Sequence, residues 1–130
     1  MIYVDTSVVL AHLLAGDRRP RASLWTETLV SSRLLECETW TRLHARKVTA
    51  SRTEAAQEVI ARISLLELAP PVLARALEPF PVPVRTLDAM HLASCRFLRD
   101  RGLHVELASY DHRMANAARA LDIPLLRDLP

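Results

Sequence analysis

Residues 1–14 read MIYVDTSVVLAHLL, and they hold a short apolar segment, a carboxylate directly after it and the start of a helix-like pattern. This order predicts a buried strand over residues 1–5 and a following helix capped by Thr6 or Ser7. Burying a carboxylate such as Asp5 after an apolar strand is costly unless it is paired, hydrogen-bonded or bound to a metal. Helix capping is the competing explanation for Asp5.

The rest of the chain continues this alternation of strand-like and helix-like segments, which predicts an α/β fold with right-handed crossovers and a mostly parallel central sheet flanked by helices on both faces. PFPVPV cannot form a regular helix and predicts a stiff connection. We expect strands at residues 1–5, 32–35, 65–68, 104–108 and 123–126. A first helix is expected at 6–15, ended by Gly16 and Asp17, and a second begins at Pro20 and carries Leu24, Trp25 and Leu29. Another helix follows the strand at 32–35 and runs to about Lys47, and the remaining helices are expected at 52–63, 70–79, 86–101 (ended by Gly102) and 112–121.

Length and composition set the broad class. A chain of 130 residues, 50% hydrophobic and 25% charged, predicts one compact domain over residues 1–130. No apolar run reaches the roughly 18 residues of a membrane helix, and the N-terminus lacks the pattern of a signal peptide. Cys37 and Cys95 lie in apolar, helix-like surroundings, so we expect buried thiols and a reducing, cytoplasmic setting.

The net charge of +2 is too small to indicate nucleic-acid binding by itself. The positive charge is nearly all arginine, Lys47 being the only lysine, and nucleotide composition of the source genome explains such a bias as well as function does. Arginine does bind phosphate bidentately. The local groups able to contact an RNA backbone are Arg18, Arg19 and Arg21, and Arg42, Arg46 and Lys47.

Four carboxylates recur in one structural role: Asp5, Glu38, Asp88 and Asp111 each follow a strand-like run or lie early in a helix-like one. Strand carboxyl ends and helix amino ends share one edge of a parallel sheet, where such folds place their sites. Carboxylates gathered there repel one another and need cations, which predicts a metal site. Capping and helix-dipole complementation remain open for each acid taken singly.

Periodicity alone does not choose between Glu36 and Glu38, which both flank an apolar stripe. His91 lies one turn after Asp88, where a lone histidine is more often a satisfied helix residue than a ligand, and a hard cation prefers oxygen donors. Asn116 follows Asp111 by about one and a half turns. It is a candidate supporting ligand, with a surface amide as the more common alternative.

Four segments carry a family resemblance: MIYVDTSVVLAHLL, SSRLLECETWTRLHAR, VRTLDAMHLASCRFL and ELASYDHRMANAARALDIPLL. In this order they resemble the PIN domain, specifically the VapC-type ribonuclease toxins of type II toxin–antitoxin systems, over essentially the whole chain. The register of the second segment, with Ser32-Arg33-Leu34 upstream and Leu43 downstream, matches Glu38 to the family acid. Two departures are Ser109, where the family often has Thr, and Asp122, where it often has Gly.

The resemblance implies an endoribonuclease that depends on Mg²⁺ or Mn²⁺ and hydrolyses RNA phosphodiester bonds. It implies metal and catalytic roles for Asp5, Glu38, Asp88 and Asp111, with Thr6, Ser7, Ser109 and Asn116 as supporting candidates. It also implies an RNA substrate, a cognate antitoxin protein, a homodimer and no membrane association.

Two competing functions remain. A receiver-type signalling domain also has an acidic metal pocket, but it needs paired acids after its first strand and a lysine opposite the phosphoacceptor. Only Asp5 follows the first strand here, and Lys47 lies at a helix end. The second alternative is a catalytically silent PIN-fold RNA-binding module, against which the presence of all four acids counts.

Overall fold

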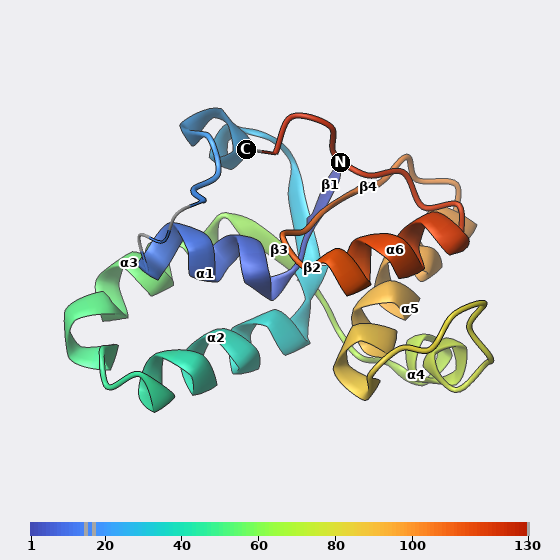
Figure 1. The fold of residues 1–130 in the computed structure, drawn as a ribbon, viewed down its shortest axis with the longest axis horizontal. Helices are drawn as coiled ribbons and strands as arrows, with labels where there is room; N and C mark the ends of the chain where they lie inside the picture. The colour runs from blue at the N-terminus through green and yellow to red at the C-terminus, as the bar shows by residue number, and fades with distance from the viewer. Residues whose placement is uncertain (15, 17, 130) are drawn as a thin grey trace.

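The computed structural model describes residues 1–14, 16 and 18–129, and within this part four parallel strands form one sheet in the order β3-β2-β1-β4 (Figure 1). The strands are β1 (Ile2–Val4), β2 (Leu29–Ser32), β3 (Ile63–Leu66) and β4 (Glu106–Ala108). The α-helices are α1 (Thr6–Leu14), α2 (Arg33–Ala45), α3 (Thr49–Ala61), α4 (Pro70–Ala76), α5 (Thr86–Asp100) and α6 (His112–Ala120), with a short 3₁₀ helix, η1, at Ala22–Thr26. The predicted α/β class with a parallel sheet is confirmed.

Strand β1 lies between β2 and β4, and its side chains alternate between the two faces of the sheet. Ile2 and Val4 belong to a buried cluster with side chains of α1, α2 and α3. Tyr3 belongs to a second cluster with side chains of α5 and α6. Figure 1 shows these two helix groups on opposite sides of the sheet, so the prediction of helices on both faces is also confirmed.

A residue with positive φ follows each of the last two helices, α5 and α6. Helix α5 covers nearly the whole predicted range, and Gly102 follows it with φ of 86°, a left-handed conformation that glycine adopts without a Cβ penalty. Asp122 follows α6 with φ of 57°. At this position, where PIN-domain proteins of the resembled type often have glycine, the backbone of Asp122 is therefore in the left-handed conformation. Aspartate tolerates that conformation better than most residues do.

The predictions for residues 20–35 were wrong. No α-helix begins at Pro20 in the described residues; only η1 forms, and Leu29 lies in β2, where it pairs with Ile2 and Ile63. The second strand is Leu29–Ser32 rather than residues 32–35. Ser32 ends it because its side chain accepts a hydrogen bond from the Leu34 amide at 3.1 Å and caps α2.

Other boundaries shifted by a few residues. Helix α3 begins at Thr49, earlier than predicted. Strand β3 also begins earlier than predicted, because Ile63 pairs with Leu29 in the sheet. The predicted strand at residues 123–126 was wrong in extent, since only a parallel bridge between Leu125 and Leu107 forms there. The predicted end of the first helix falls partly on Ala15 and Asp17, which lie outside the described residues.

Cys37 is exposed on α2, so the prediction that it is buried was wrong, whereas Cys95 is buried as predicted. The apolar stripe of α2 instead directs Leu35 and Leu43 into the core. Among the described residues, no helix is both long enough and apolar enough to cross a bilayer.

Candidate metal and nuclease site

All four acids line one cavity of about 170 Å³, here called the acidic pocket. Asp5 follows β1, Glu38 lies in α2, Asp88 lies in the first turn of α5, and Asp111 caps α6 after β4. The carboxyl ends of the parallel strands and the amino ends of the following helices meet at one edge of the sheet. Four segments that are distant in sequence therefore line the same pocket. The pocket is lined by Asp5, Thr6, Ser7, Leu10, Glu38, Arg42, Arg85, Asp88, His91, Asp111 and Met114.

Asp5 is the most deeply buried of the four acids, at 3% exposure. Its Oδ1 accepts hydrogen bonds from the Ser7 amide at 3.0 Å and from the Ser7 hydroxyl, and its Oδ2 accepts one from the Ser109 hydroxyl. Burial raises the pKa of Asp5, and the hydrogen bonds from Ser109 and Ser7 oppose that rise. A bound cation in the pocket would favour the ionised form further.

Glu38 is held by two donors from other elements. Its Oε1 accepts hydrogen bonds from the Thr6 hydroxyl at 2.8 Å and from Nε2 of His91 at 2.6 Å. Because Glu38 can only accept when ionised, Nε2 of His91 carries a proton, and Nδ1 of the same ring pairs with the Tyr3 hydroxyl at 2.8 Å. Burial raises the pKa of Glu38, but the hydrogen bond and charge of His91, with Thr6 and Arg42, outweigh it, so the pKa is lowered.

Arg85 lies between the remaining two acids. Its Nε donates to Oδ2 of Asp88 at 3.1 Å, and its Nη2 donates to Oδ2 of Asp111 at 3.2 Å. The other oxygen of Asp111 accepts from the Arg113 amide at 2.9 Å, which is the helix cap considered in the sequence. Capping and pocket lining are therefore roles of different oxygens of the same carboxylate.

The donor set suits a hard divalent cation, because four carboxylates supply only oxygen ligands. Within residues 1–14, 16 and 18–129, no three His, Cys, Asp or Glu side chains converge tightly enough to form a preassembled metal cluster. The sequence predicted that a metal ion offsets the repulsion between these carboxylates. In the structure the guanidinium of Arg85 supplies positive charge beside Asp88 and Asp111. A cation that binds Asp88 and Asp111 would therefore compete with Arg85 for their Oδ2 atoms.

The supporting residues divide into two groups. Thr6, Ser7 and Ser109 each donate a hydrogen bond to a pocket carboxylate. Asn116 does not line the pocket; it is exposed, and its Oδ1 accepts from Arg119 at 2.8 Å. Glu36 also points elsewhere, toward Arg33 at 3.8 Å, whereas Glu38 lines the pocket.

Three polar residues of the pocket were not among the predicted site residues: Arg85, His91 and Arg42. Arg85 precedes α5 and lies three residues before Asp88, a spacing that places the two side chains on one helix face. The sequence spacing could therefore have placed Arg85 beside Asp88 in the predicted site. His91 was interpreted as a satisfied helix residue, and its two ring nitrogens are indeed paired, one of them with a pocket acid.

Comparisons with known proteins agree with this geometry. A model of the PIN domain family matches residues 2–120. The chain is 30% identical over 126 residues to a protein named ribonuclease VapC47 from Mycobacterium tuberculosis (strain CDC 1551 / Oshkosh), covering 92% of this chain and 90% of that protein. It is 31% identical over 129 residues to ribonuclease VapC46 from M. tuberculosis (strain ATCC 25618 / H37Rv), covering 96% and 95%.

Proposed function

Because the chain belongs to the PIN domain family, as the sequence resemblance indicated, we propose that it is an endoribonuclease that requires Mg²⁺ or Mn²⁺. The observation that carries the proposal is the convergence of Asp5, Glu38, Asp88 and Asp111 on one small pocket. The names of the two similar proteins support RNA as the substrate.

In this proposal the four acids hold the cation, which supplies an activated water and neutralises charge on the leaving oxygen when it is bound. The chain's own groups keep the acids in place. Ser7 and Ser109 fix both oxygens of Asp5, while His91 and Thr6 fix one oxygen of Glu38. Glu38 stays ionised at neutral pH because its pKa is lowered, so it is able to accept a proton or a cation.

Cleavage of total cellular RNA by the purified chain tests the proposal. We expect cleavage with Mn²⁺, none after chelation, and none by Asp5→Asn or Asp88→Asn protein. Asp100→Asn is the matched control, because Asp100 pairs with Arg96 at 3.3 Å and does not line the pocket. Equal cleavage by wild type and Asp5→Asn protein, both folded by circular dichroism, contradicts the assignment. RNA binding without any metal-dependent turnover would instead favour the silent binding module.

We also propose that the chain is the toxin of a toxin–antitoxin pair, acting in the cytoplasm as a homodimer covered by a cognate antitoxin protein. The support is the resemblance of the chain to VapC-type proteins. Expression of the chain alone is then expected to arrest growth, and Asp5→Asn is expected to relieve the arrest. Light scattering on the purified chain measures whether it is a dimer.

A further inference from the structure

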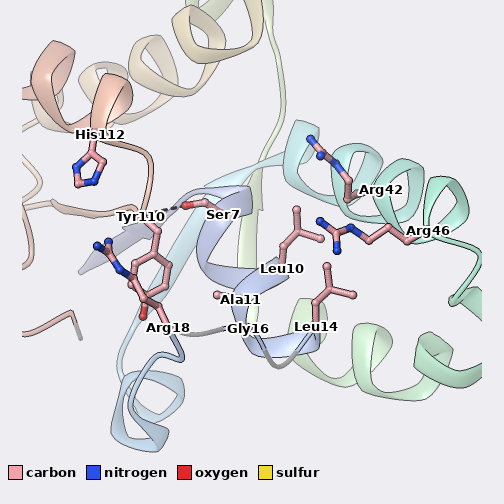
Figure 2. Close-up of a pocket in the computed structure, with 10 residues that line it drawn as sticks. All are labelled: Ser7, Leu10, Ala11, Leu14, Gly16, Arg18, Arg42, Arg46, Tyr110 and His112. Carbon is pink, nitrogen blue, oxygen red and sulfur yellow. Dashed lines mark hydrogen bonds between the residues drawn. The ribbon is translucent and has the colours of Figure 1, made fainter.

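A larger cavity, of about 470 Å³, opens beside the acidic pocket, and the two share Ser7, Leu10 and Arg42 as lining residues. Figure 2 shows the residues that line it along α1, at the carboxyl end of α2 and around the start of α6. We call it the basic cavity. Because the walls are shared, a flexible chain lying over the acidic pocket reaches the basic cavity without crossing intervening protein.

The charge of this cavity is opposite to that of its neighbour. Arg18, Arg42 and Arg46 line it, and none of its described lining residues is acidic. Arg42 lies in the last turn of α2 and Arg46 caps the helix four residues later, and within the described part of the chain neither makes a salt bridge. Their guanidinium groups are therefore available to an anionic ligand.

The remaining walls suit a flat ring. The Tyr110 side chain forms one wall, with its amide donating to the Ser7 hydroxyl at 2.9 Å and the Arg18 guanidinium 6.0 Å from its ring centroid. Leu10 and Leu14 provide apolar surface opposite (Figure 2). An aromatic ring, arginines and an apolar wall are what a nucleotide needs for base stacking and phosphate contact.

We propose that the basic cavity binds an RNA nucleotide adjoining the phosphodiester to be cleaved, with its base against Tyr110 and its phosphate on Arg42 and Arg46. This inference rests on the proposed nuclease function for the location of the scissile phosphate. An RNA strand is favoured over a protein segment because phosphates recur along it, so one strand satisfies the arginines here and a cation in the adjoining acidic pocket.

Fluorescence anisotropy of an end-labelled, short single-stranded oligoribonucleotide of mixed sequence tests the proposal. The assay contains EDTA, so binding is measured without cleavage. Tyr110→Leu is expected to weaken binding about five- to hundredfold, as loss of one stacked base does, while Tyr110→Phe retains most of the affinity. Arg46→Gln is expected to reduce the slope of log affinity against log salt by about 0.7, the contribution of one phosphate contact to a single strand. Arg127→Gln is the charge-matched control, because Arg127 lines a different cavity.

Unchanged RNA affinity in both Tyr110→Leu and Arg46→Gln overturns the proposal, as does an equal loss in Arg127→Gln, which would indicate a general effect of charge. Variants that keep RNA affinity but lose binding of a labelled polyglutamate peptide also overturn it, in favour of a protein-docking groove. If the expected losses occur but the wild type cuts no RNA with Mn²⁺, the basic cavity stands and the nuclease assignment fails.

Discussion

Nε2 of His91 lies 2.6 Å from Oε1 of Glu38, and the histidine is only 2% exposed. The other ring nitrogen pairs with the hydroxyl of Tyr3, which is fully buried in the central strand β1. A pocket acid is thus connected through one imidazole to the core of the sheet. Both ring nitrogens are satisfied, so the ring has little freedom to turn.

Replacing Tyr3 with phenylalanine breaks the inner end of this connection. We expect the free energy of unfolding to fall by about 1–3 kcal/mol, because Nδ1 of His91 is left buried without its hydrogen-bond partner. Loosening of Glu38 is expected to lower kcat for RNA cleavage more than it changes KM. Urea denaturation and steady-state kinetics measure the two effects. Tyr110→Phe is the control, since its hydroxyl has no partner among the described residues; equal stabilities of the two variants contradict the prediction.

Glu36 and Glu38 provide a matched pair on one helix. Glu38→Gln is expected to reduce metal-dependent cleavage by about a hundredfold or more, the lower range for loss of a catalytic acid–base group. Glu36→Gln is expected to retain wild-type cleavage, because Glu36 lies outside the pocket. Initial rates on the same RNA compare them, and a larger loss in Glu36→Gln would reverse the assignment.

Removing Arg85 tests its competition with the cation. Arg85→Met frees Asp88 and Asp111, and we expect Mn²⁺ to bind more tightly, because the competing positive charge beside the two carboxylates is gone. Isothermal titration calorimetry measures the affinity without relying on cleavage. Arg33→Met is the control, because it removes an exposed arginine–carboxylate pair with Glu67 away from the pocket. Weaker Mn²⁺ binding by Arg85→Met than by Arg33→Met would show that Arg85 assists the cation.

The two thiols are expected to react at very different rates. Burial raises the pKa of the Cys95 thiol to about 12, so its reactive thiolate is scarce until the pH approaches that value. Cys37 is exposed. With a disulfide reagent near pH 8, we expect one fast thiol in the folded protein and two after denaturation. Cys37→Ser should abolish the fast reaction, and persistence of a fast thiol in that variant would contradict the assigned burial.

The elements that sequence predicts best are those whose pattern is local. Residues 2–4 are wholly apolar, and residues 86–100 combine a helical period with a terminal glycine, so both were found. Leu29 was misassigned because its spacing from Leu24 and Trp25 fits a helix, whereas pairing with Ile2 and Ile63 places it in the sheet. Propensity gives way to tertiary pairing there, and that pairing leaves no mark in the local sequence.

The residues of the candidate site were likewise predicted where the signal is local and missed where it is not. The acids were identified because strand ends and helix starts carry a sequence signature. Of the groups that hold them, Thr6, Ser7 and Ser109 were predicted. The pairs Arg85–Asp111 and His91–Glu38 were missed because they are long-range: 26 positions separate the first pair and 53 the second. Side-chain direction explains the rest, since Asn116 has a plausible spacing from Asp111 but points to solvent and pairs with Arg119.

The hydrogen bond from Ser109 to Asp5 joins residues 104 positions apart, and β1 needs β4 as a neighbour on that side. During synthesis on a ribosome, the first strand must therefore wait until residues 106–108 emerge before it can pair with β4. The pocket is completed only when translation of this domain is almost finished. A nascent chain consequently carries Asp5 long before it carries the other three acids, so the acidic pocket forms only after residue 111 has emerged.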